Sequence, residues 1–105
     1  MHMFVPTQQQ LESRFAMLNA QFFNGALDVD ELEIDTSGDD FCGAGDDNDE
    51  IVIVMCNEYD DEQQFINLLA HEMTHVWQIM NDLPGGHDGA FAEKAVYFQQ
   101  FGITI

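Results

Sequence analysis

Two histidines separated by three residues mark the part of the chain whose side chains can do chemistry. The segment reads His71-Glu72-Met73-Thr74-His75. Residues four apart on a helix lie on the same face, so the two imidazoles can bind one metal ion. The carboxylate beside the first histidine can then act on a metal-bound water molecule. The pattern predicts a zinc hydrolase, provided that the segment is helical and that a third ligand exists.

The sequence around this motif is typical of a helix. No glycine or proline occurs between Asp60 and Leu83, and either residue would weaken or interrupt a helix. Apolar residues recur at helical spacing, which predicts a buried stripe with the two histidines beside it. The stripe consists of Phe65, Leu69, Met73, Val76 and Met80. We expect a helix that begins near Asp61, with Asp60 as its cap, and ends at Leu83-Pro84.

The third ligand is the second condition, because a catalytic zinc ion takes three protein ligands and one water molecule. The compact spacing HxxGxxH is not met, since Gln78 stands at the position of the glycine. His87 follows a Pro-Gly-Gly turn that can bring the chain back over the helix. Glu93 is the alternative, because carboxylates also bind zinc. The turn favours His87.

The rest of the sequence predicts the elements that position these residues. A first helix is expected from about Gln8 to Phe23, with Thr7 as its cap and Gln10 reaching back to it. A third helix is expected from Gly89 to about Gln100, with Asp88 as its cap. Strands are predicted at Glu31–Asp35, Phe41–Gly45 and Ile51–Cys56. The order helix, strands, helix, helix indicates one α+β domain over residues 1–105.

The chain is strongly acidic. Twenty Asp and Glu residues against two basic residues, Arg14 and Lys94, give the 105 residues a net charge of −18. Proteins that bind duplex DNA use Lys and Arg at the phosphates, so direct nucleic-acid binding is not expected at ordinary salt. Basic residues are scarce along the whole chain, which favours adaptation to a salty cytoplasm. Mimicry of a nucleic-acid surface is the alternative interpretation.

Several patterns bear on location and on other metal sites. The apolar run at 51–56 is too short to span a bilayer, and the first residues lack the features of a signal peptide. We therefore expect a cytoplasmic protein. Cys42 and Cys56 are the only cysteines, and we expect both to be reduced and buried. A zinc ribbon is excluded, because it needs four Cys or His ligands in paired spacings.

Several segments, in the same order, resemble the SprT-like (Spartan-type) zinc metallopeptidase family. Phe22-Phe23-Asn24-Gly25-Ala26-Leu27 resembles the family's Phe-Asn-Gly-x-Leu. Leu68-Leu69-Ala70-His71-Glu72-Met73-Thr74-His75 resembles its Leu-x-His-Glu-Met-x-His. Gly86-His87-Asp88-Gly89-Ala90-Phe91 resembles its Gly-His-Gly-x-x-Phe, with Asp88 in place of a glycine. The resemblance covers approximately residues 8 to 101.

This resemblance implies a minimal zincin-like domain. It implies that His71, His75 and His87 bind one zinc ion per chain and that Glu72 is the catalytic acid/base of a metalloendopeptidase. The family's zinc ribbon and basic DNA-binding parts have no counterpart here, so repair of DNA–protein crosslinks is not carried over. From the negative charge we expect a basic or unstructured protein or peptide substrate. The alternative is a non-enzymatic acidic interaction protein, with a structural metal site and a basic partner.

Two further roles depend on the predicted zinc site. The strand from Ile51 to Met55 is a candidate edge for pairing with an extended peptide, and a central place in the sheet is the alternative. Tyr59 and Tyr97 are candidate donors to the oxyanion. The alternative for each tyrosine is an aromatic of the core or its rim.

Overall fold

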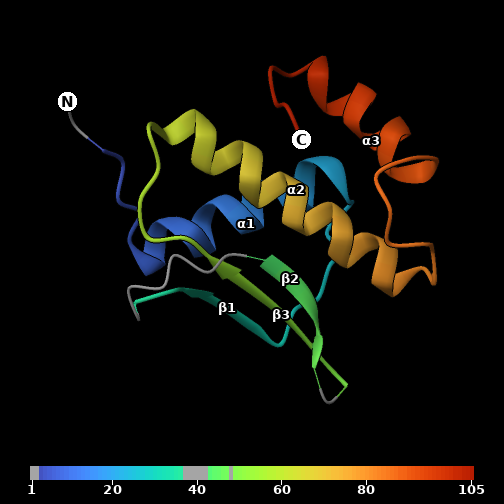
Figure 1. Cartoon of the computed structure of the whole chain (residues 1–105), viewed down its shortest axis with the longest axis horizontal. Coiled ribbons are helices and arrows are strands. Elements are labelled where there is room, and N and C mark those ends of the chain that lie inside the picture. Colours follow the sequence, from blue (N-terminus) through green and yellow to red (C-terminus); the bar gives the residue numbers. More distant parts are fainter. Residues whose placement is uncertain (1–2, 37–42, 48) are drawn as a thin grey trace.

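Two helices cover one face of a small mixed sheet, and a third helix packs beside them (Figure 1). The helices are α1 (Gln8–Phe22), α2 (Glu62–Met80) and α3 (Ala90–Gln99), and the strands are β1 (Glu31–Ile34), β2 (Gly43–Asp47) and β3 (Glu50–Met55). The structure is a computed structural model, and the residues described are 3–36, 43–47 and 49–105. Within these residues the predicted α+β order is confirmed.

β3 is the central strand, in the order β1-β3-β2. It runs parallel to β1, with Ile53 opposite Leu32, and antiparallel to β2, with Ile53 opposite Ala44. The suggestion that the strand from Ile51 to Met55 offers a free edge is therefore wrong. Within the described residues, the outer edges belong to β1 and β2.

Both long helices begin with side-chain caps. Thr7 Oγ1 accepts from the N–H of Gln10 at 3.1 Å, and Gln10 Oε1 accepts from the N–H of Thr7 at 2.9 Å. This is the predicted capping box. The cap of α2 is Asp61, one residue later than predicted, and its side chain accepts from the N–H of Gln64 at 2.8 Å. Asp60 instead donates its own N–H to Gln64 Oε1 at 2.7 Å.

Other boundaries also differ from the prediction. α3 begins after Gly89, whose φ of 57° suits glycine, and no side chain caps it, so the expectation that Asp88 is the cap is wrong. The second strand begins at Gly43, and residues 41–42 of its predicted range lie outside the described residues. No described cysteine is free, so the expectation of a reduced Cys56 is wrong. Cys42 lies outside the described residues.

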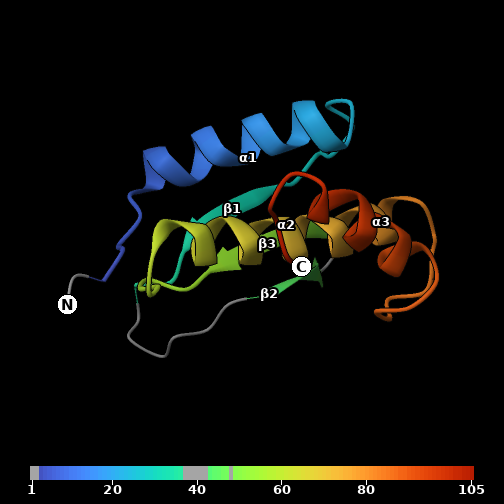
Figure 2. The ribbon, with the colours of Figure 1, turned by 90° about the horizontal axis from the view of Figure 1, so that it is seen from above.

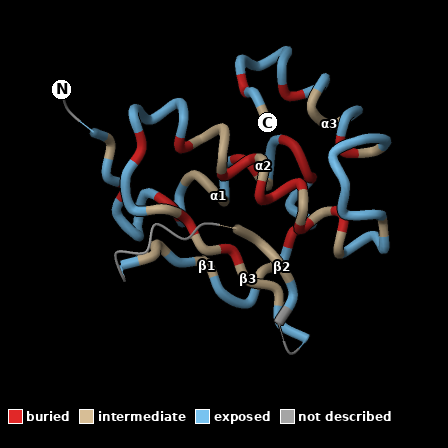
Figure 3. The backbone as a smooth tube through the Cα atoms, viewed as in Figure 1, coloured by how far each residue is buried: buried red, intermediate tan, exposed pale blue. Residues whose placement is uncertain are grey.

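The core lies between the sheet and the helices, where the buried segments of Figure 3 meet. The predicted stripe of α2 is fully buried except for Met80, which is 40% exposed. The four buried members of the stripe pack in one cluster with Leu11, Leu18, Ile53, Met55 and Phe98. Viewed from above, α1 runs beside β1, and the C-terminal end of the chain lies against the middle of α2 (Figure 2). Among the described residues, every helix is too short or too polar to cross a membrane.

Candidate metal centre

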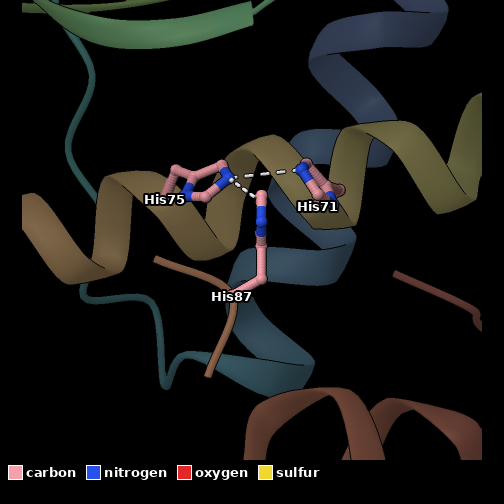
Figure 4. A group of neighbouring side chains, drawn as sticks. All are labelled: His71, His75 and His87. Carbon is pink, nitrogen blue, oxygen red and sulfur yellow. Dashed lines mark hydrogen bonds between the residues drawn. The ribbon is translucent and has the colours of Figure 1, made fainter. Parts of the chain in front are cut away.

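Three histidine side chains meet between α2 and the loop that follows it (Figure 4). His71 and His75 project from the same face of α2, and His87 projects from the loop between α2 and α3. Nε2 of His75 lies 3.2 Å from Nε2 of His71 and 3.1 Å from Nε2 of His87. Each residue offers one ligand nitrogen, and all three atoms lie within 4.8 Å of one another. The structure therefore brings together the three histidines singled out from the sequence.

Hydrogen bonds on the far side of two rings determine which nitrogen carries the proton. Nδ1 of His71 lies 2.8 Å from the main-chain oxygen of Ile105, and Nδ1 of His75 lies 2.7 Å from Oε1 of Gln78. Carbonyl oxygens only accept hydrogen bonds, so each Nδ1 is the donor. A neutral imidazole has one N–H, which leaves both Nε2 atoms with bare lone pairs. Lone pairs that face each other repel, and either a proton or a metal ion between them removes the repulsion.

The donor set fits zinc. Imidazole nitrogens bind zinc at about 2.0–2.1 Å, and a tetrahedral ion at that distance separates neighbouring ligand atoms by about 3.3 Å. The two Nε2 separations from His75, 3.1 and 3.2 Å, are close to this value. Three protein ligands would leave a fourth position of a bound zinc ion for water, as in catalytic zinc sites. These histidines could therefore hold a metal ion.

Glu72 lies beside the histidines and faces the sheet. Its side chain is buried, with Oε1 3.8 Å from Nε2 of His71. Its Oε2 lies 3.8 Å from the place that a Cβ on Gly43 would occupy. Burial raises the pKa of the Glu72 carboxyl above its usual range, and the nearby histidine rings offset part of this rise. A carboxyl with a raised pKa is suited to accepting and returning a proton near neutral pH.

The other candidate residues do not belong to the histidine cluster. Glu93, the rival ligand, is exposed on α3 and lines a different hollow with Lys94 and Tyr97. Tyr59 is buried, which raises its pKa to about 12. Tyr97 is half-exposed and packs edge-on against Phe22. The tyrosines thus occupy a core and a rim position, and their oxyanion role stays a prediction.

Two contacts of the site were not singled out as functional from the sequence. Gln78 stands at the glycine position of the compact HxxGxxH spacing, and the sequence predicted no other role for it. It lies three residues after His75 on the same helix, and side chains at that spacing are neighbours, so its contact was open to prediction. Ile105 contacts His71 through its main chain. Every residue type has a main-chain oxygen, so the identity of residue 105 does not predict this contact.

Hollows flank the histidine cluster. One of about 340 Å³ is lined by Ala44, His75, Gln78, Ile79, Gly85 and His87. Another of about 200 Å³ is lined by Gln64, Asn67, Leu68, His71, Thr104 and Ile105. A larger hollow of about 450 Å³ lies on the sheet and includes Glu31, Glu33, Val52 and Val54 in its lining. Its lining contains no histidine or cysteine, so the histidine cluster borders the two smaller hollows and not this one.

The fold and the site define an α+β domain with a three-histidine cluster that could hold a metal ion. No family model, curated protein or solved structure matches the chain. Membership of the SprT-like family and a zincin-like fold therefore stay predictions that rest on the motifs.

Proposed function

We propose that this protein is a zinc metallopeptidase of the SprT-like, zincin-like type. The observation that supports the proposal best is the convergence of the Nε2 atoms of His71, His75 and His87, with the Nδ1 of His71 and that of His75 each beside a carbonyl oxygen. These three side chains would hold one zinc ion per chain. A bound zinc ion supplies a Lewis acid that lowers the pKa of water and polarises the carbonyl of the peptide bond.

Glu72 is the group that moves the proton in this proposal. Its carboxylate accepts a proton from the attacking water and delivers it to the leaving amine. Burial supports this role, because it raises the pKa of the carboxyl towards the range in which both steps are possible. Gly43 supports it too, since a residue without a Cβ leaves the space beside Oε2 of Glu72 open on the side of β2.

The outer edge of β2 is suited to an extended peptide. Within the described residues β2 pairs only with β3, so the main-chain groups of its other edge are available for a further strand. Ala44 of β2 lines the hollow that also contains His75 and His87. A peptide on this edge would therefore pass the histidine cluster. The net charge of −18 favours a basic or unstructured substrate.

The alternative function is that of a non-enzymatic acidic interaction protein. The larger hollow on the sheet supports it, because the carboxylates of Glu31 and Glu33 border the apolar Val52 and Val54 there. Such a surface suits a partner that carries Lys or Arg next to apolar side chains. In that case the metal would only stabilise a small fold. A cytoplasmic location is compatible with either function and stays a prediction.

Metal analysis combined with a cleavage assay on an unstructured basic peptide tests the proposal. The wild type should bind one zinc ion and cleave the peptide. Glu72→Gln should bind zinc equally well and lose about 10²–10⁴-fold in rate, because an amide cannot accept the proton. Glu93→Gln is the matched control, since it makes the same change at an exposed carboxyl and also tests the rival ligand.

The outcomes separate the two functions. Unchanged cleavage by Glu72→Gln would exclude the role proposed for this residue. Absence of zinc, or a closed site with four protein ligands, would favour the interaction protein. Loss of zinc in Glu93→Gln would show that Glu93 is a ligand after all.

A further inference from the structure

Gln78 connects the second histidine to the loop that carries the third. It is a buried polar residue of α2, with 1% of its surface exposed. Its Oε1 accepts from Nδ1 of His75 at 2.7 Å, and its Nε2 donates to the main-chain oxygen of Gly86 at 2.8 Å. Gly86 directly precedes His87 in the sequence. One side chain is thus bonded to one candidate ligand and to the residue before another.

The loop determines the direction of both hydrogen bonds. The carbonyl of Gly86 can only accept, so the NH₂ group of Gln78 must face it. The amide oxygen then faces His75, and because it also only accepts, the proton lies on Nδ1 of His75. The Nε2 of His75 is left as a lone pair directed at the other two rings. A reversed amide would place two acceptors, its own oxygen and the Gly86 carbonyl, against each other and lose that buried bond.

The loop itself needs such an attachment. Gly85 and Gly86 give it a wide choice of backbone conformations, and His87 is exposed. The main-chain oxygen of Gln78 accepts from the N–H of Leu83 at 2.9 Å, which holds the start of the loop. The side chain of Gln78 holds its other end at Gly86. Together these two bonds restrict where His87 can stand.

We propose that Gln78 is a positioning residue that holds His75 in its metal-binding tautomer and couples it to the position of His87. The inference rests on the proposed function, because it concerns metal affinity only if the three histidines bind a metal ion. It deepens that function by adding a residue from outside the HExxH motif. Partners of metal ligands typically change metal affinity by about 10–100-fold.

Two substitutions separate the two contacts of Gln78. Gln78→Met removes both hydrogen bonds at similar length. Gln78→Glu, studied at a pH where the new carboxyl is ionised, keeps an acceptor for His75 but cannot donate to Gly86. Titration with Co²⁺, followed by its visible absorption, measures affinity, and competition with Zn²⁺ extends the measurement. We expect Gln78→Met to weaken binding about 10–100-fold and Gln78→Glu to weaken it less.

A double-mutant cycle with His87→Ala tests the coupling. If Gln78→Glu acts through the loop, it should cause no further loss of affinity once the His87 imidazole is absent. Gln78→Met should still cause a loss in that background, because it also releases His75. Additive effects of Gln78→Glu and His87→Ala would overturn the coupling.

The tautomer of His75 gives a readout that needs no metal. Nitrogen NMR of the metal-free protein, at a pH where the histidines are neutral, should show the proton on Nδ1 of His75. Gln78→Met should lose this preference. Thr74→Val is the matched control, because it removes another buried hydrogen bond of α2, from Thr74 Oγ1 to the main-chain oxygen of Ala70, and should leave the tautomer unchanged.

The results distinguish the inference from the function on which it rests. A wild-type protein that binds neither Co²⁺ nor Zn²⁺ would overturn both. Normal binding by the wild type, together with unchanged affinity in both Gln78 variants, would overturn the inference alone. Gln78→Glu has nearly the same shape as the wild-type residue, so it keeps the test decisive if Gln78→Met does not fold.

Discussion

The Nε2 nitrogen of His71 lies 3.8 Å from Oε1 of Glu72. This distance is too long for a hydrogen bond, so the carboxylate is near the ring without being bonded to it through these atoms. Burial has the larger effect on Glu72 and raises its pKa, while the three neighbouring histidines offset only part of that rise. The folded protein therefore holds the charged carboxylate at a cost in free energy.

Replacing Glu72 should consequently stabilise the metal-free protein at neutral pH. The pKa of Glu72 is higher in the folded than in the unfolded state, so the folded state binds the proton more tightly. The resulting loss of stability is fully present above the pKa of Glu72 in the folded state. It disappears as the pH falls below the ordinary pKa of a glutamate in an unfolded chain. Thermal melts of metal-free Glu72→Gln should show a higher melting temperature than the wild type at neutral pH. The difference should disappear in acid, and a less stable variant at neutral pH would contradict the prediction.

A ladder of side chains on α2 holds the C-terminal segment 102–105 against the site. Its members lie four residues apart on one face of the helix, and each bonds to the main chain of that segment. They are Gln63, Asn67 and His71. Since the bond to His71 determines its tautomer, anything that loosens the segment should also affect the metal.

Asn67→Leu should therefore weaken metal binding although Asn67 is not a ligand. The substitution removes the acceptor for the N–H of Thr104, which lies at 3.2 Å. We expect a loss of Co²⁺ affinity of up to about 10-fold, the lower end of the range for partners of metal ligands. Hydrogen exchange at Thr104 should become faster in parallel. Faster exchange with unchanged affinity would show that the segment does not orient His71.

Lys94 joins α3 to the other two helices. Its Nζ donates to the main-chain oxygen of Phe22 at 2.9 Å, at the C-terminal end of α1, where the carbonyls favour a positive charge. The same atom lies 4.6 Å from the ring centroid of Phe23 and 4.9 Å from that of Trp77. Lys94→Met should lower the free energy of unfolding by about 1–3 kcal/mol, because a charge-assisted hydrogen bond and two ring contacts are lost.

Arg14→Met is the matched control for this substitution, because it removes the only other Lys or Arg charge of the chain. Arg14 makes an ion pair with Glu62 at 3.3 Å near the surface, and such a pair contributes at most about 1 kcal/mol. Denaturant unfolding of both variants gives the comparison. Equal losses would show that net charge, and not the contacts of Lys94, determines the effect.

The melting temperature should rise with KCl. At a net charge of −18 the carboxylates repel one another, and raising the ionic strength from about 0.1 M to 1 M shortens the screening length from about 10 Å to 3 Å. The chain has only two Lys and Arg residues, so added salt weakens few favourable ion pairs. Thermal melts at the two concentrations measure the effect. Equal stability would contradict adaptation to a salty environment.

The features that the sequence predicted are those decided by local spacing. The directions of His71 and His75 follow from their separation along a helix, and the Thr7 capping box follows from two residues three apart. The place of β3 was not predictable, because its apolar pattern does not reveal which strands flank it. The contact between His71 and Ile105 joins residues 34 positions apart and uses a main-chain oxygen. It could not be predicted, because neither the spacing nor the type of residue indicates it.

The position of Ile105 also bears on when the site can assemble. Synthesis runs from the N-terminus, so His71 and His75 leave the ribosome well before residues 102–105. Until those residues have emerged, the Nδ1 of His71 lacks the acceptor that it has in the folded protein, and either ring nitrogen is free to carry the proton. The His71 ring is therefore oriented late in synthesis. By then the helix that carries it has already left the ribosome.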